Sequence, residues 1–138
     1  MIILDTNVLS ELMRPTPSVR VVEWVQSQPA VELFTTSITE AEIFYGIELL
    51  AKGERHAALQ AAAEAMFTDD FAGRVIGFDS NATRSFASIA ARRLALGKPI
   101  SHPDAQIAAI TRLHQAVLAT RDVADFDNCG IRVVDPWS

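Results

Sequence analysis

Short runs of apolar residues alternate with longer segments of helical character along this 138-residue chain. The first run, residues 1–4, is uninterrupted and contains two adjacent isoleucines, which is typical of a strand buried on both faces. Further strands are expected at residues 33–35, 75–78, 117–119 and 131–134. Helices are expected over residues 8–13, 19–28, 37–51, 54–71, 80–96 and 103–114.

Residues that start or stop helices agree with these boundaries. Pro15 ends the first predicted helix, and Ser37 is expected to cap the third. Gly97 follows the fifth predicted helix, and Pro103 suits the first turn of the sixth. Strands that alternate with helices favour a parallel sheet covered on both faces. The pattern therefore predicts an α/β protein with three α/β/α layers and a parallel sheet of about five strands, in a single domain over residues 1–138.

The composition indicates the cellular compartment of the protein more clearly than its function. The net charge is −5, from 12 Lys and Arg against 17 Asp and Glu, so no overall basic surface points to nucleic acid. A carboxylate metal site would account for part of that negative charge. No stretch is long and apolar enough to span a membrane, no signal peptide is evident, and Cys129 has no partner for a disulfide. We therefore expect a cytoplasmic protein with no membrane association.

Two acidic residues follow predicted strands. Asp5 comes directly after the first strand, and two residues separate Asp122 from the end of the fourth strand. Ligands of open parallel sheets bind beyond the carboxyl ends of the strands, so both positions suggest a site. Asp104 lies in the first turn of a predicted helix, where a carboxylate is also stabilised by the helix dipole without any further role. Glu42 lies within a helix, on the same apolar stripe as Ile38, Tyr45 and Leu49, and a carboxylate there needs a cation or a donor. Periodicity does not distinguish it from Glu40, which also has apolar neighbours at helical spacing.

If these four carboxylates converge, they require a cation, because like charges at close range raise one another's pKa. Divalent cations of the Mg²⁺ and Mn²⁺ type prefer oxygen ligands, and no Cys or His lies at ligand spacing. Such ions activate water and stabilise the oxygens of a phosphodiester during its cleavage. The chemistry favours phosphodiester hydrolysis, but convergence itself is a question of tertiary structure.

Four motifs, in order along nearly the whole chain, resemble those of PIN-domain proteins, and specifically the VapC-like toxins of bacterial type II toxin–antitoxin pairs. They are residues 4–11 (LDTNVLSE), 39–46 (TEAEIFYG), 97–109 (GKPI followed by DAQIAA) and 120–137 (TRD, DF, G and DPW). The second motif selects Glu42 over Glu40. The subgroup that the chain most resembles is FitB-like. One departure is Asp122, where many relatives carry Asn, and an Asp is the stronger metal ligand.

The resemblance implies a PIN fold and an Mg²⁺-dependent endoribonuclease, with Mn²⁺ as a second possible cofactor. It implies that Asp5, Glu42, Asp104 and Asp122 form the catalytic metal site. Asn7 and Thr120 would orient ligands or water through hydrogen bonds, and Asp125 would act through water or simply cap its loop. The implied partners are an RNA substrate, a cognate antitoxin, operator DNA reached through that antitoxin, and a second copy of the chain in a homodimer. The alternative is a subunit of a DNA-bound regulatory complex with little or no nuclease activity.

Several arginine residues each allow two interpretations. Arg121 lies between two site residues, where it could contact phosphate or pair with the acids. Arg84, Arg92 and Arg93 could bind RNA backbone or form a solvated helix face. Trp137 is interpreted as a packing residue rather than a platform for bases.

Overall fold

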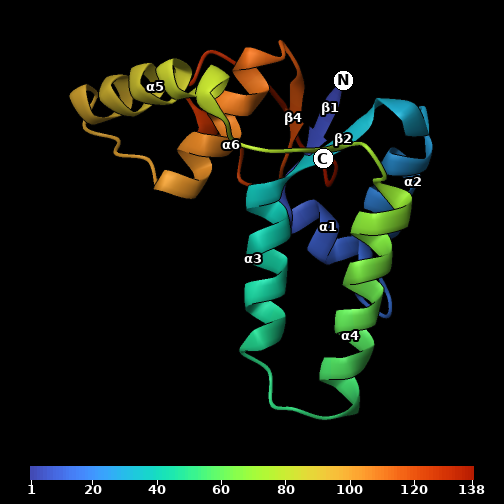
Figure 1. The fold of residues 1–138 in the computed structure, drawn as a ribbon. Helices are drawn as coiled ribbons and strands as arrows, with labels where there is room; N and C mark the ends of the chain where they lie inside the picture. Colours follow the sequence, from blue (N-terminus) through green and yellow to red (C-terminus); the bar gives the residue numbers. More distant parts are fainter.

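The computed structural model describes all residues, 1–138, and is built on a five-stranded sheet (Figure 1). The strands are β1 (Ile2–Leu4), β2 (Leu33–Thr36), β3 (Val75–Ile76), β4 (Val117–Ala119) and β5 (Arg132–Val134). Every pairing is parallel, and the strand order is β3-β2-β1-β4-β5. The predicted five-stranded parallel sheet is thereby confirmed.

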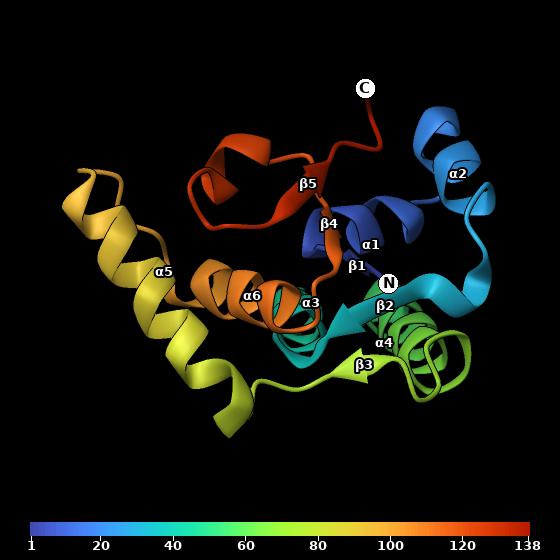
Figure 2. The same cartoon turned by 90° about the horizontal axis from the view of Figure 1, so that it is seen from above.

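Helices connect these strands and cover both faces of the sheet (Figure 2). They are α1 (Thr6–Leu12), α2 (Val19–Gln26), α3 (Ser37–Glu48), α4 (Glu54–Ala65), α5 (Thr83–Ala95) and α6 (His102–Leu113). Short helical turns occupy residues 30–32, 66–70, 80–82 and 123–126. None of the helices combines the length and the apolar character needed to cross a membrane.

Two separate apolar cores lie on the two faces of the sheet. Leu4 of β1 and Ala119 of β4 point into a core formed with helices α1 to α4. Their neighbours Ile3 and Leu118 point into the other core, formed with α5 and α6. Successive side chains of a strand face opposite sides, so short strands with no polar position can serve both cores at once. This is the three-layer α/β/α arrangement expected from the apolar runs.

Helix α3 differs from its prediction in two respects. Its N-cap is Thr36, whose hydroxyl accepts a hydrogen bond from the Thr39 N–H at 3.1 Å, and not Ser37, which is already helical. Thr36 still has the extended backbone of the strand that it ends, which is the conformation an N-cap residue requires. Tyr45 and Leu49, predicted to share an apolar stripe with Glu42, are exposed, whereas Thr39, Ile43 and Ile47 form the buried face.

The order of the strands places a crevice at one edge of the sheet. From central β1 the chain moves outward through β2 and β3, and then returns to the other side of β1 with β4 and β5. The carboxyl ends of β1 and β4 are therefore adjacent at the point where the direction of winding changes, which is where open α/β sheets bind ligands. The backbone N–H of Asp5 donates to the Ala119 carbonyl at 3.0 Å, so the pairing extends to the first predicted site residue.

Candidate active site

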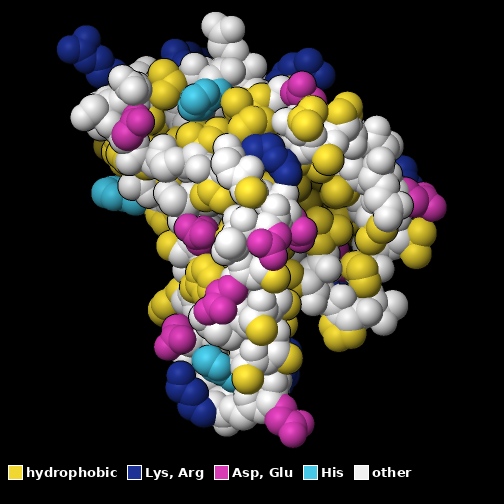
Figure 3. Space-filling view, turned by 45° about the vertical axis from the view of Figure 1, so that its right-hand side comes forward, with side chains coloured by type: hydrophobic (Ala, Val, Ile, Leu, Met, Phe, Trp, Pro, Cys, Tyr) yellow, Lys and Arg dark blue, Asp and Glu magenta, His cyan; other side chains and the backbone are white.

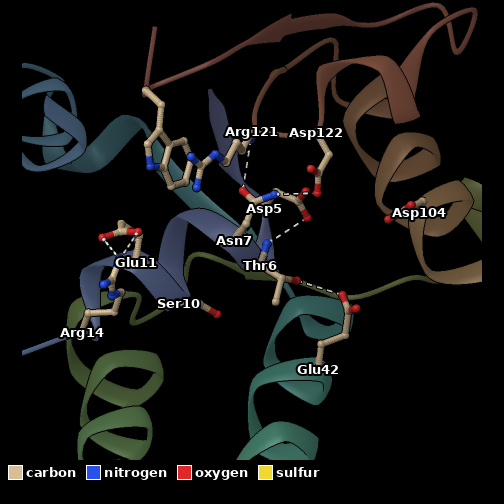
Figure 4. Close-up of a pocket in the computed structure, with 11 residues that line it drawn as sticks. Asp5, Thr6, Asn7, Ser10, Glu11, Arg14, Glu42, Asp104, Arg121 and Asp122 are labelled. Atoms are coloured by element: carbon tan, nitrogen blue, oxygen red, sulfur yellow. Dashed lines mark hydrogen bonds and ion pairs between the residues drawn. The ribbon is translucent and has the colours of Figure 1, made fainter. Parts of the chain in front are cut away.

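All four predicted carboxylates line one pocket at this edge of the sheet (Figure 4). The pocket has a volume of about 530 Å³, within the range of small-molecule and cofactor sites. Its lining is almost entirely polar: Asp5, Thr6, Asn7, Ser10, Glu11, Arg14, Glu42, Asp104, Arg121, Asp122 and Trp137. Glu40 is not among these residues, so the geometry separates it from Glu42 where periodicity does not.

Asp5 is the buried centre of the site. Only 6% of the residue is exposed, and its two carboxylate oxygens accept hydrogen bonds from the Thr6 N–H at 2.8 Å and the Thr120 hydroxyl at 2.7 Å. Burial raises the pKa of Asp5 to about 6, the two hydrogen bonds oppose that rise, and Asp104 and Glu42 add to it as neighbouring negative charges. The fold therefore holds an acid in a place where its ionised form is costly.

A hydrogen-bonded chain links Asp5 to Asp122. The Thr120 hydroxyl, fully buried, accepts from the Asn7 side chain and from the Asp122 backbone N–H, both at 3.1 Å, while it donates to Asp5. The Asn7 amide also donates to Asp122 Oδ2 at 3.1 Å. Asn7 and Thr120 thus lie between two acids whose positions they restrain.

The other two acids approach from different helices. Glu42, on α3, accepts a hydrogen bond from the Thr6 hydroxyl at 2.8 Å, which is the donor that an acid at this position was expected to need. Asp104 lies in the first turn of α6, whose N-cap is Ser101. Burial raises the pKa of Asp104, and nearby Asp125, Glu42 and Asp122 raise it further. Asp125 itself does not line the pocket.

The pocket contains a fifth acid, Glu11, which the sequence pattern did not single out as a site residue and which has a structural role. Its carboxylate accepts from the Ser18 backbone N–H at 2.9 Å and pairs with Arg14 at 3.2 Å. The hydrogen bond from Ser18, more than any other contact, lowers the pKa of Glu11. Glu11 therefore links the end of α1 to the start of α2, and these contacts distinguish it from the other four acids of the pocket.

The side chains that could ligate a cation in this pocket offer only oxygen atoms. The four carboxylates face it from β1, α3, α6 and the end of β4, although no three acidic, His or Cys side chains approach closely enough to ligate one ion together as they stand. The donor set suits a hard divalent cation such as Mg²⁺ or Mn²⁺. Burial, and to a smaller extent neighbouring carboxylates, raise the pKa of Asp5 and of Asp104, and a bound cation would stabilise their ionised forms.

Arg93 has a positioning role that its sequence pattern did not indicate. From the sequence we expected for this arginine either an RNA contact or a place on a solvated helix face. It is 6% exposed, and its guanidinium donates to the carbonyls of Lys98, Asp125 and Asp127 at 2.7, 2.6 and 3.1 Å. Lys98 lies in the segment that leads to Asp104, and the other two carbonyls belong to the loop that follows Asp122. One side chain therefore joins the segment that precedes Asp104 to the segment that follows Asp122.

Replacing Arg93 with methionine is expected to lower the free energy of unfolding by about 2–4 kcal/mol, because buried carbonyls lose a charged donor. Arg92→Met, at an exposed position one residue earlier on α5, is the matched control and should change stability by less than about 0.5 kcal/mol. Urea unfolding followed by circular dichroism measures both. Equal losses in the two variants would contradict a specific role for Arg93.

These features, an open parallel α/β sheet and a crevice lined with carboxylates, define a class of α/β proteins with an acidic site at the carboxyl edge of the sheet. A model of the PIN-domain family matches residues 2–130. The chain belongs to the PIN-domain family, as its four motifs predicted.

Relatives within that family match over nearly their full lengths. The chain is 38% identical to the plasmid stability protein StbB of Pseudomonas syringae pv. tomato over 99% of both proteins. It is 37% identical to the VapC ribonuclease Y4jK of Sinorhizobium fredii and to the toxin FitB of Neisseria gonorrhoeae, over at least 98% of each. Among solved structures, it is similar to a chain of FitAB bound to an IR36 DNA fragment, with a TM-score of 0.93 over 100% of this chain and 96% of that one. The predicted likeness to VapC and FitB is confirmed.

Proposed function

We propose that this protein is a metal-dependent endoribonuclease toxin that hydrolyses RNA phosphodiester bonds in the cytoplasm and is inhibited by a cognate antitoxin. The observation that carries the proposal is the arrangement of Asp5, Glu42, Asp104 and Asp122 around one pocket. Relatives named VapC ribonuclease and toxin FitB support the same activity.

The four carboxylates would hold Mg²⁺ or Mn²⁺, and the bound ion would supply Lewis acidity and an activated water at the scissile phosphate. The chain itself holds its acidic side chains in position before the ion or the substrate binds. Thr120 and the Thr6 N–H hold the two oxygens of Asp5, and Asn7 restrains Asp122. The Thr6 hydroxyl orients Glu42 from the same turn of α1. Preset ligands of this kind reduce the reorganisation that substrate binding requires.

An apolar groove on this chain, beside the acidic pocket, offers a binding surface for an antitoxin. The groove lies between α1, α3 and α4, and the residues Met13, Ile43, Ile47, Leu50 and Leu59 form its apolar lining. Ser10, Arg14 and Glu42 line both the groove and the acidic pocket, so the two are continuous. Figure 3 shows acidic side chains across the middle of the molecule, with apolar surface next to them. A helix with a basic residue at one end suits such a surface.

The assay that tests the proposal uses the chain purified free of any antitoxin. Cleavage of a broad RNA pool is expected with Mg²⁺ or Mn²⁺, and is expected to stop with EDTA and in Asp104→Asn. The carboxylate of Asp104 has no ion-pair partner in the protein, so its loss acts on the site rather than on a salt bridge. Cleavage that survives both chelation and the substitution would point to a contaminating nuclease and contradict the metal-site mechanism.

A second candidate function is that of a subunit in a DNA-bound regulatory complex with little nuclease activity. The observation that favours it is the similarity to a FitAB chain in a complex with DNA. In that case the purified chain would cleave no RNA, and a complex with its antitoxin would bind operator DNA. Homodimerisation also stays a prediction, for which the exposed Tyr45 and Leu49 on α3 offer apolar surface.

A further inference from the structure

One of the arginines that line the acidic pocket forms no ion pair with a carboxylate. Two arginines line the pocket, and Arg14 is paired with Glu11. Arg121 has no carboxylate within ion-pair distance, although its charge makes a minor contribution to the lowered pKa of Glu11, and its only hydrogen bond is from its backbone N–H to Asn7 Oδ1 at 3.2 Å. An arginine beside several carboxylates that pairs with none of them has all of its guanidinium N–H groups available. Of the two interpretations that its sequence position allowed, pairing with the acids is therefore not realised.

The guanidinium of Arg121 is held by an aromatic ring instead. Its Cζ atom lies 5.0 Å from the ring centroid of Trp137, within the range of a cation–π contact. Trp137 is anchored in turn, because its backbone N–H donates to Asp135 Oδ1 at 2.8 Å and its side chain packs against the apolar core of α1 to α4. A cation–π contact consumes none of the N–H donors, so the arrangement fixes the guanidinium without occupying its hydrogen bonds.

We propose that Arg121, held on the Trp137 ring, binds a phosphate of the RNA backbone next to the phosphate that is cleaved. This inference rests on the proposed ribonuclease function. A planar guanidinium matches a phosphate through two parallel hydrogen bonds, which an ammonium group cannot form. A negatively charged substrate entering an acid-rich pocket is repelled, and Arg121 is the lining cation left free to offset that repulsion.

The position of Arg121 in the chain links phosphate binding to the acids. Arg121 directly precedes Asp122, and Asn7 holds both residues, through the Arg121 backbone N–H and the Asp122 carboxylate. Figure 4 shows the side chains of Arg121 and Asp122 leaving neighbouring backbone positions in different directions, Asp122 toward Asn7 and Arg121 away from Asp122 and Asp104. A phosphate bound at Arg121 would therefore set the register of the strand relative to the carboxylates.

The test measures RNA binding rather than cleavage. A fluorescein-labelled single-stranded oligouridine is titrated with Asp5→Asn protein, without added metal, over a range of KCl concentrations. Adding Arg121→Gln is expected to weaken binding about tenfold at low salt, the effect of losing a hydrogen-bonded charge. It should also reduce the slope of log K against log salt by about 0.7, the contribution of one phosphate contact on a single strand.

Two comparisons make this result specific. Arg132→Gln removes the same charge from the exposed first residue of β5, at the opposite edge of the sheet, and is expected to leave the slope unchanged. Trp137→Leu should reproduce much of the Arg121→Gln loss, and Trp137→Phe, which keeps an aromatic face, should retain most of the binding. Circular dichroism confirms that each variant is folded. Equal slopes for Arg121→Gln and Arg132→Gln would overturn the proposal.

The outcome separates this inference from the proposed function. Arg121-dependent RNA binding by a protein that cleaves no RNA would refute the ribonuclease and leave the phosphate site standing. Metal-dependent cleavage with no effect of Arg121→Gln on RNA binding would do the reverse. A polyglutamate peptide is the probe for a carboxylate partner: if Arg121→Gln weakens its binding and leaves RNA binding unchanged, Arg121 serves an acidic protein segment and the proposal is wrong.

Discussion

Asp5→Asn is expected to reduce metal-dependent RNA cleavage by at least about 100-fold, because loss of a group that merely supports a metal ligand already costs about 10–100-fold. The substitution keeps the size of the side chain and the oxygen that accepts from the Thr6 N–H. It removes the charge at the buried centre of the pocket. Initial rates at saturating Mg²⁺, with the same RNA pool, measure the effect.

The same substitution is not expected to destabilise the metal-free protein at pH 7. Ionised Asp5 is disfavoured in the fold, since its pKa rises from 3.8 to about 6, a difference worth about 3 kcal/mol by the free energy of one pKa unit. An asparagine is free of that cost, which exceeds the value of the single hydrogen bond from the Thr120 hydroxyl that its amide nitrogen cannot accept. The free energy of unfolding in EDTA should therefore equal or exceed that of the wild type, which shows that lost cleavage is not lost folding.

Asp69→Asn is the matched control, because Asp69 is exposed and lies outside the pocket. It should retain wild-type cleavage. If Asp5→Asn kept more than about a tenth of the wild-type rate, the loss would be smaller than that expected for a supporting residue, and Asp5 would not be a metal ligand.

Addition of Mg²⁺ or Mn²⁺ is expected to raise the melting temperature by about 5–10 °C when the ion is present at about 100 times its Kd, which corresponds to about 2.7 kcal/mol. The folded site binds the ion and the unfolded chain offers no assembled ligands. Differential scanning fluorimetry at constant ionic strength measures the shift. The shift should be absent in Asp5→Asn and reduced in Asp104→Asn.

The metal-induced shift should grow as the pH rises from 5 to 7.5. In EDTA, the raised pKa of Asp5 stabilises the fold below the unfolded pKa of 3.8, and this contribution is lost as the pH rises through about 6. The metal requires the ionised carboxylate, so its binding strengthens over the same interval. The raised pKa of Asp104 acts in the same direction. A shift that is equal at pH 5 and 7.5, or that persists in Asp5→Asn, would mean that the ion binds elsewhere.

Local pattern was sufficient for the sheet and for the positions of two acids. Strands β1 and β4 are short and apolar on both faces, so each could be recognised without its neighbours, and the helices between the first four strands favoured parallel pairing. The positions of Asp5 and Asp122 near the site could be inferred from the strands that precede them. The end of α4 was harder to place: the predicted helix over residues 54–71 is α-helical only to Ala65, and a wider π-helical turn follows.

The helix α3 shows why periodicity failed at Glu42. The helix is amphipathic with respect to one core, but its exposed side carries Tyr45 and Leu49, so apolar spacing alone suggested the wrong stripe. Helical spacing reports which residues share a face, and does not report what that face meets. The family motif selects Glu42 over Glu40, and the position of α3 beside α1, with the Thr6 hydroxyl next to Glu42, gives the physical reason.

The sequence by itself determined the α/β/α architecture, the family, and the four acids as candidates, because each depends on local pattern or on motifs along the chain. The tertiary structure decided that the four acids share one pocket, that Glu11 is engaged elsewhere, that Arg93 is buried between two loops, and that Arg121 rests on Trp137 instead of pairing with an acid. These are relations between residues far apart in the chain. They depend on strand order and helix placement, which no local pattern encodes, and they set the charge balance of the pocket.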